Sequence, residues 1–200
     1  MKLDIVIAGV GGQGNILSSQ TLAKCAMDAG YNVVNTETKG AAQRGGSVVS
    51  HLRVGTETIY SPLVPQGQAD VLLGFEPLEA IRNLALLSKQ GQYIINTAPI
   101  PTILANLKVD KYPDRQEMMD IIQKEGVEGY FIDATNAARD LGDALLTNVV
   151  MLGAFTAINS LLSPEIILNK LLSQVSEKYH AADIKAFNLG REIIRSQKGE

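Results

Sequence analysis

Short apolar runs alternate with amphipathic stretches along the first two thirds of the chain. Residues 4–8 are a mostly apolar run of β-forming residues that ends at a glycine, which is typical of a strand buried on both faces. Residues 13–29 then carry apolar side chains at helical spacing, and residues 31–36 form a second β-type run. A strand, a helix and a strand within about thirty residues predict a right-handed crossover unit with parallel strands.

The same alternation continues to about residue 133. Further strands are predicted at 47–54, 70–75, 92–97 and 130–133, and further helices at 77–88, 101–107 and 115–124. Gly55 and Thr56 predict a turn into a short strand at 57–60, which gives a β-hairpin, and the polar residues 37–46 are expected to form a loop. This order predicts an α/β fold: a doubly wound, mostly parallel Rossmann-like sheet with helices on both sides.

The C-terminal part has no strand pattern and predicts a helical layer. We expect one domain over residues 1–200, with an α/β core to about 140 and a helical region from about 141. Apolar residues recur at helical spacing from Leu145 to Ile158, so burial in the core is their first interpretation. A partner interface is the alternative, because leucine pairs at 161–162 and 171–172 add apolar area.

Composition narrows the class of protein. The 200 residues are 46% hydrophobic and 20% charged, as in ordinary globular proteins. The net charge of −3 gives no bulk attraction to nucleic acid or to an anionic membrane. No apolar run approaches the roughly 20 residues that span a bilayer. We therefore expect a cytoplasmic protein with neither kind of partner.

Cysteine and histidine are too few for the common metal sites. Cys25 is the only cysteine, which excludes an intrachain disulfide and an iron–sulfur cluster held by this chain alone. The sequence has only two histidines, His51 and His180, so a zinc site of the Cys/His type is nearly excluded. Cys25 lies among Ala and Met in a predicted helix, where a buried, inert thiol is the expectation.

The first loop with candidate chemistry lies between the first strand and the first helix. Its sequence GVGGQG, residues 9–14, matches the G-x-G-x-x-G pattern in the strand-to-helix context that the pattern requires. Glycines permit positive φ and close backbone approach, and the unpaired amides of Gly11, Gly12, Gln13 and Gly14 at a helix start attract anions. The alternative is a tight turn with no ligand, in which Gln13 only fills space.

A nicotinamide-dependent dehydrogenase would also need an acid after the second strand. Glu37 is close to that position. However, Lys39 is near enough to neutralise it, and the chain continues into an unusual loop instead of a second crossover helix. The support for a dinucleotide site is therefore weak.

That unusual loop contains the second candidate binding residues. They are Gln43, Arg44, Gly45, Gly46 and Ser47. The Arg44 guanidinium can hold a phosphate or carboxylate through two hydrogen bonds, and the glycines let backbone amides join it. Because both loops follow the carboxyl ends of strands, we expect them to converge on one crevice. The alternative is that Arg44 pairs with a surface acid.

These two loops resemble a known family. GGQG at 11–14 followed by QRGGS at 43–47 is similar to the gamma module of the 2-oxoacid:ferredoxin oxidoreductases. The longer run ETKGAAQRGGSVVSHLR at 37–53 resembles the form found in the beta subunit of indolepyruvate:ferredoxin oxidoreductase, and ADVLLGFEP at 69–77 and IINT at 94–97 also match family motifs. The resemblance covers most of the chain.

The resemblance implies a subunit that is inactive by itself. In that family a large partner carries thiamine diphosphate and the iron–sulfur clusters, and the complex oxidatively decarboxylates an aryl-2-oxoacid, acylates coenzyme A and reduces ferredoxin. Gly11–Gly14 and the loop with Arg44 would then hold an anion in the active-site crevice, and this chain would hold no cofactor alone. The residues leave two alternatives open: a stand-alone NAD(P)-binding oxidoreductase of the Rossmann type, and a ligand-sensing or scaffolding domain.

Two more polar residues have structural interpretations. His51 lies in the predicted strand 47–54, where a hydrogen-bonded structural histidine is expected more than a base. Asp133 follows a predicted strand and is expected to cap the next helix. No arrangement of nucleophile, base and acid can be built from two histidines and one shielded cysteine, so no catalytic residue is predicted.

Overall fold

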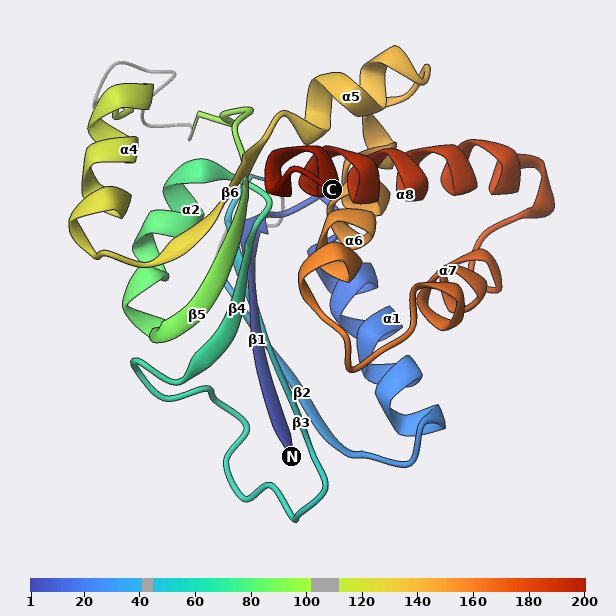
Figure 1. Ribbon diagram of the computed structural model, residues 1–200, viewed down its shortest axis with the longest axis horizontal. Coiled ribbons are helices and arrows are strands. Elements are labelled where there is room, and N and C mark those ends of the chain that lie inside the picture. The colour runs from blue at the N-terminus through green and yellow to red at the C-terminus, as the bar shows by residue number, and fades with distance from the viewer. Residues whose placement is uncertain (41–44, 102–111) are drawn as a thin grey trace.

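A computed structural model describes residues 1–40, 45–101 and 112–200 (Figure 1). Within these residues six strands form one sheet in the order β2-β3-β1-β4-β5-β6. The strands are β1 (Lys2–Val10), β2 (Asn32–Lys39), β3 (Ser47–Gly55), β4 (Ala69–Gly74), β5 (Leu87–Asn96) and β6 (Glu128–Ile132). The pairings β1–β4, β4–β5 and β5–β6 are parallel, and β3 pairs antiparallel with both β1 and β2. The predicted α/β class with a mostly parallel sheet and a hairpin is confirmed.

The hairpin, however, lies elsewhere in the chain than predicted. β2 extends to Lys39, so residues 37–39 are not loop, and β3 pairs back onto β2 with Lys39 opposite Val48. β1 and β2 run in the same direction but are separated by β3. The predicted strand at 57–60 does not form, because the Arg53 guanidinium binds the carbonyls of Ser61 and Leu63 at 3.1 and 3.3 Å. That contact holds the segment after β3 as an irregular loop.

The helices agree with the sequence pattern except after β4. They are α1 (Asn15–Asp28), α2 (Pro77–Arg82), α4 (Arg115–Lys124), α5 (Ala134–Asp140), α6 (Thr147–Ile158), α7 (Pro164–Leu172) and α8 (Glu177–Lys198), with short 3-10 turns η1 (Leu84–Leu86) and η2 (Ala144–Leu146). The predicted helix at 77–88 ends early: Asn83 donates its side-chain amide to the Glu79 carbonyl at 2.8 Å, and this local bond competes with the helix. The predicted helix at 101–107 lies almost wholly outside the described residues.

Helix α4 begins and ends at the predicted residues because its start is encoded locally. Asp114 accepts from the Glu117 amide, and the Glu117 carboxylate accepts from the Asp114 amide, each at 2.9 Å. This capping box satisfies two amides that a helix start otherwise leaves unpaired.

Helices cover both faces of the sheet (Figure 1). One face packs against α1 and the C-terminal helices, with Ile5, Ile7 and Leu73 in its core. The other face packs against α2 and α4, with Val6 and Leu72 in its core. Alternate residues of β1 thus enter opposite cores, as a strand buried on both faces requires.

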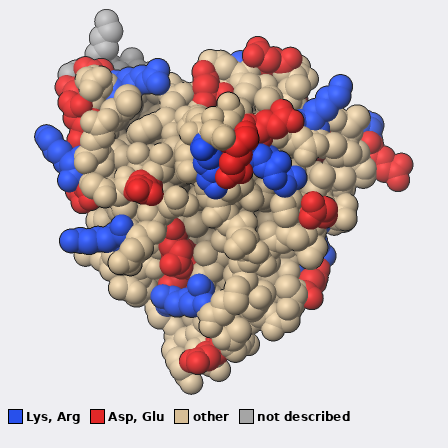
Figure 2. Space-filling model, viewed as in Figure 1, with Lys and Arg blue, Asp and Glu red and all other residues tan. Residues whose placement is uncertain are grey.

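The C-terminal helices form the predicted helical layer. Val149, Leu152 and Phe155 are buried, which confirms the core interpretation, whereas Leu145 is 75% exposed. No helix in the described part of the chain is long and apolar enough to cross a membrane. Figure 2 shows Lys, Arg, Asp and Glu scattered over one face of the molecule, without a large patch of a single sign.

Cys25 is predicted to resist thiol reagents in the native protein. Its side chain is fully buried in α1, its Sγ points to the Ile166 carbonyl at 3.7 Å, and burial raises the pKa of the thiol to about 11. Since the thiolate is the reactive species, a disulfide reagent at about pH 8 should leave native Cys25 unmodified and modify it once the protein is unfolded. Rapid modification of the native protein would show that the thiol is accessible and ionised.

His51 is predicted to weaken the fold at acidic pH. It is buried in β3, and its Nδ1 accepts from the Val64 amide at 3.2 Å, as a structural histidine would. Burial, and secondarily the Arg53 charge, lower its pKa below the ordinary 6.5. The unfolded chain therefore binds the proton more tightly than the folded protein does. The stability that neutral His51 contributes is complete above about pH 6.5 and is lost as the pH falls through the lowered pKa of the folded state.

Urea unfolding of wild type and His51→Gln at about pH 8 and about pH 5 checks this sign. The variant's deficit in unfolding free energy should be larger at the higher pH. An equal deficit at both values would contradict the shift.

Candidate functional site

The turn between β1 and α1 presents free backbone amides at a helix start. Gly12 has φ 101°, and Gly14 has φ 82° as the N-cap of α1. No side chain caps this helix, and the amides of Gly12 and Gly14 donate to no described residue. Glycine adopts the positive φ of this turn without strain, and unpaired N–H groups at a helix start are the arrangement that binds anions.

The second loop meets this turn directly. The Gly11 amide donates to the Gly46 carbonyl at 2.9 Å, and the Asn15 side chain donates to the Val48 carbonyl at 3.2 Å. The predicted convergence of the two loops is thus confirmed for the described residues. Gln43 and Arg44 lie outside them, while Gly45 is exposed with φ 70°. The anion-binding role of both loops stays a prediction.

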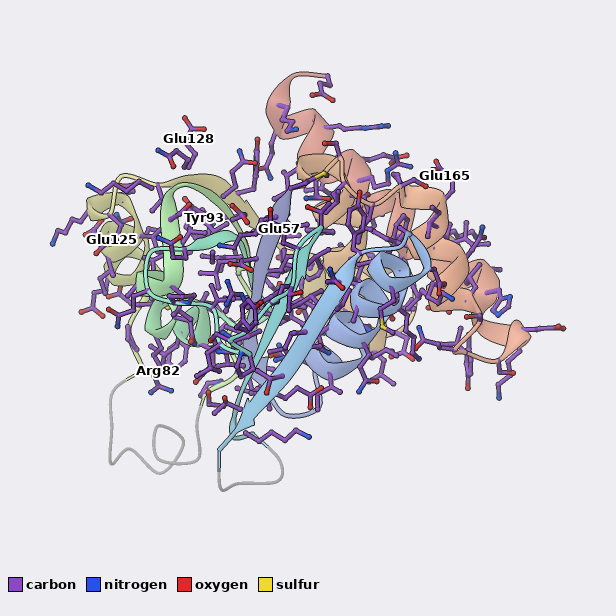
Figure 3. The ribbon with its side chains drawn as sticks, turned by 90° about the horizontal axis from the view of Figure 1, so that it is seen from below. Glu57, Arg82, Tyr93, Glu125, Glu128 and Glu165 are labelled. Carbon is purple, nitrogen blue, oxygen red and sulfur yellow. The ribbon has the colours of Figure 1, made fainter. Side chains whose placement is uncertain are left out.

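Ser47 contacts a carboxylate. Its hydroxyl donates to Glu79 of α2 at 2.6 Å, and the second Glu79 oxygen accepts from Arg82 at 2.6 Å. Glu79 is buried, whereas the Arg82 side chain is half exposed at the end of α2 (Figure 3). Ser47 therefore fastens the second loop to α2, with its hydroxyl already engaged.

Gln13 and Asn96 share one backbone carbonyl at the ends of the central strands. The Phe75 carbonyl, directly after β4, accepts from Gln13 Nε2 at 2.8 Å and from Asn96 Nδ2 at 3.0 Å. Gln13 Oε1 also accepts from the Val10 amide at 2.9 Å. Both polar groups of Gln13 are thus used to hold the turn, which favours its structural interpretation over direct ligand contact.

Asn96 extends this network to the next strand end. Its Nδ2 reaches the Thr135 hydroxyl at 2.9 Å, and its Oδ1 accepts from the Thr135 amide at 3.3 Å. Hydrogen bonds therefore connect the ends of β1, β4, β5 and β6 beneath one cavity. This cavity of about 230 Å³ lies beside Gly12, Gln13, Ile100, Thr135 and Arg139, and Arg139 is the only charged side chain among the described residues that line it.

Glu76 holds the segment after β5 at the same edge. One oxygen caps α2 through the Glu79 amide at 2.9 Å, and the other accepts from the Ile100 amide at 3.3 Å and from the Tyr112 hydroxyl. Burial, followed by the bond to the Glu76 carboxylate, raises the pKa of Tyr112 well above its ordinary range. Sequence reasoning assigned no individual role to Glu76, Glu79 or Asn96. Glu76 lies just after β4, Glu79 lies in the first turn of α2 and Asn96 is the last residue of β5, so their position near strand ends was the available signal.

Other predicted residues have structural partners. Glu37 pairs with Lys39 at 3.2 Å, as the nearby lysine indicated, so it is not free for ribose hydroxyls. Asp133 accepts from the Asn136 amide at 3.2 Å and caps α5, as predicted. Among the described residues, no group of three or more Cys, His, Asp or Glu side chains is arranged to hold a metal. The single buried thiol does not fit an iron–sulfur cluster.

Two glycines of the turn give a matched pair of substitutions. A Cβ at Gly14 would lie 2.9 Å from three Asn148 side-chain atoms, whereas a Cβ at Gly12 would meet nothing within 4 Å. Both alanine variants lose about 1–2 kcal/mol to positive φ. Gly14→Ala should lose a further 1–3 kcal/mol or so from overpacking. Urea unfolding of the two variants measures the difference, and equal losses would contradict the contact.

Comparison with known proteins agrees with this architecture. The chain matches the family model described as pyruvate ferredoxin/flavodoxin oxidoreductase over residues 4–193. It is 38% identical to indolepyruvate oxidoreductase subunit IorB of Pyrococcus horikoshii, covering 94% of each chain, and 37% identical to its counterpart in Thermococcus kodakarensis, covering 99% of this chain and 98% of that one.

Solved structures show the same fold. The gamma subunit of the keto/oxoacid ferredoxin oxidoreductase of Geobacter sulfurreducens superimposes with a TM-score of 0.71 at 24% identity, covering 97% of this chain and 99% of that one. The 2-oxoglutarate:ferredoxin oxidoreductase of Magnetococcus marinus gives a TM-score of 0.75 at 23% identity, covering 98% of this chain and 31% of that chain. With the family model matching nearly the whole length, this chain belongs to the pyruvate ferredoxin/flavodoxin oxidoreductase family.

Proposed function

We propose that this chain is the non-cluster subunit of an indolepyruvate or aryl-2-oxoacid:ferredoxin oxidoreductase and is inactive without its large partner. The observation that carries the proposal is the full-length similarity to subunits named for indolepyruvate oxidoreductase, at 38% and 37% identity. The single cysteine supports the proposal that the partner holds the iron–sulfur clusters, because the clusters that reduce ferredoxin need ligands that this chain lacks.

The contribution of this chain would be a wall of the active-site crevice. The free amides of Gly12 and Gly14 supply donors for an anionic group, and Arg44 is predicted to join them. The Magnetococcus marinus relative was solved with 2-oxoglutarate, coenzyme A and succinyl-CoA bound. Coenzyme A, with its phosphates, is therefore one candidate for the anion, and the substrate carboxylate is the other. Thiamine diphosphate in the partner would supply the decarboxylation chemistry.

The alternative of a stand-alone nicotinamide enzyme has less support. Glu37, the expected ribose ligand, is paired with Lys39, and the strand that follows turns back as β3 instead of leading into a second crossover helix. The family assignment also favours the subunit role.

Complex formation tests the proposal. The chain should co-elute in size-exclusion chromatography with the cysteine-rich thiamine-dependent subunit, and NAD or NADP should produce no binding heat in calorimetry with the chain alone. Failure to co-elute, together with measurable nicotinamide binding, would contradict the subunit role.

A further inference from the structure

Helix α5 presents two polar side chains to the cavity of about 230 Å³ beside the turn between β1 and α1. Thr135 and Arg139 both line this cavity, and their spacing of four residues places them on the same face of the helix. Thr135 is partly exposed and Arg139 is exposed, so neither is closed off from a ligand. Thr147, the first residue of α6, adds a second hydroxyl to the lining.

The hydrogen bonds of Asn96 determine how the Thr135 hydroxyl can be used. Asn96 is fully buried, and its Nδ2 donates one hydrogen to the Phe75 carbonyl at 3.0 Å and the other to Thr135 Oγ1 at 2.9 Å. Asn96 Oδ1 accepts from the Thr135 amide at 3.3 Å, which fixes the orientation of the side-chain amide. The Thr135 oxygen therefore serves as an acceptor, and its single hydrogen remains for another partner.

That hydrogen has no close acceptor within the described part of the chain. The Thr147 hydroxyl lies 3.5 Å from Thr135 Oγ1, and its own hydrogen goes to the Ala144 carbonyl at 2.6 Å. Hydroxyl hydrogen bonds normally span about 2.5–3.0 Å, so the contact between the two threonines is weak. Asn96 thus holds the Thr135 hydroxyl in place while its hydrogen stays available to a ligand.

The other available groups in the cavity are also donors. The Gly12 amide donates to no described residue, and Arg139 makes one described hydrogen bond, from Nη1 to the Asn136 side chain at 2.9 Å. No Asp or Glu is among the described residues that line the cavity. A cavity with an arginine, a hydroxyl and an amide as donors, and with no carboxylate in its described lining, suits an anionic oxygen.

We propose that Thr135 is a binding residue of the reaction, whose hydroxyl donates to an anionic oxygen in this cavity, and that Asn96 is the positioning residue that holds it. The proposal rests on the proposed function and deepens it. The oxygen has two possible sources with the same chemistry, a phosphate of coenzyme A and the carboxylate of the 2-oxoacid. Because the hydroxyl is already fixed, little conformational freedom is lost when the ligand binds.

Steady-state kinetics of the assembled complex test the proposal. Thr135→Val keeps the side-chain shape and removes the hydroxyl, and Thr135→Ser returns a hydroxyl to the same position. Thr156→Val is the matched control, because Thr156 is buried in α6, donates its hydroxyl to the Gly153 carbonyl at 2.7 Å and does not line this cavity.

We expect Thr135→Val to raise KM for either coenzyme A or indolepyruvate about 10- to 100-fold, the range for a hydrogen bond to a charged group. The ligand whose KM rises is the source of the anionic oxygen. kcat should be nearly unchanged, because the contact forms in the ground state and the transition state alike. Thr135→Ser should restore most of the affinity, and Thr156→Val should keep both KM values of wild type.

Asn96→Ala should raise KM for the same ligand as Thr135→Val does. Its effect should be smaller in the Thr135→Val background, because part of it acts through the Thr135 hydroxyl. An undiminished effect in that background would show that Asn96 does not position Thr135.

A hydroxyl with only a structural role would lower the free energy of unfolding of Thr135→Val and leave both KM values unchanged, which would overturn the proposal. An equal rise in both KM values, as a displaced α5 would cause, or a rise that Thr135→Ser does not reverse, would also overturn it. A complex that forms but does not oxidise indolepyruvate would contradict the proposed function instead. Calorimetry of that complex with coenzyme A and with indole-3-lactate, an unreactive carboxylate, then decides: weaker binding of one of them to Thr135→Val supports the proposal, and equal binding or none overturns it.

Discussion

Replacing Gly153 with alanine is expected to lower the free energy of unfolding by about 3 kcal/mol, the upper part of the range for overpacked cores. Helices α6 and α8 cross with their backbones in contact: a Cβ on Gly153 would lie 1.9 Å from the Phe187 carbonyl oxygen. Reciprocally, a Cβ on Gly190 would lie 1.9 Å from the Val150 carbonyl oxygen. Backbone atoms cannot rotate away as a side chain can, so the helices must separate.

Gly190→Ala is expected to cause a loss of similar size, and the double variant should cost less than the sum, because one separation of the helices relieves both clashes. Asn188→Ala, at an exposed position of α8, is the control and should be neutral or slightly stabilising, since alanine is the better helix former. Urea unfolding of wild type and the four variants measures these differences. A Gly153→Ala protein as stable as wild type would contradict the close crossing.

Replacing Arg44 with alanine is expected to reduce kcat/KM of the assembled complex about 10- to 100-fold, as removal of a charge-assisted hydrogen bond would. This expectation rests on the proposed function and on the prediction that Arg44 joins the Gly12 and Gly14 amides around an anion. Arg195→Ala is the control, because Arg195 is exposed near the end of α8.

Steady-state rates at varied coenzyme A and at varied 2-oxoacid show which ligand the guanidinium holds. A rise in KM for one ligand alone identifies it. Equal kcat/KM for Arg44→Ala, Arg195→Ala and wild type would show that Arg44 does not bind either ligand.

The elements that could be predicted from the sequence are those encoded by neighbouring residues. The Asp114–Glu117 capping box encodes the start of α4, and the apolar run that ends at Gly9 encodes β1. The hairpin was placed wrongly because the turn signal was assigned to the end of β3 and not to the segment before it. Gly55 and Thr56 carry a turn signal, but Arg53 binds the carbonyls beyond them, and β3 pairs with β2 across residues 40–46.

The site also contains some features that neighbouring residues encode and others that depend on distant segments of the chain. The meeting of the two loops followed from their position after strand ends, and the Gly11–Gly46 hydrogen bond confirms it. Glu76 and Asn96 could not be assigned, because their hydrogen-bond partners come from segments far apart in the chain.

The central claim is that this chain works only as part of a larger oxidoreductase. Its most direct test is the rate of viologen reduction with indolepyruvate and coenzyme A, measured for this chain, for its thiamine-bearing partner and for the mixture. The account predicts activity in the mixture that rises with added chain until the partner is saturated, and none with this chain alone. Full activity of the partner without this chain, or nicotinamide reduction by this chain alone, would contradict it.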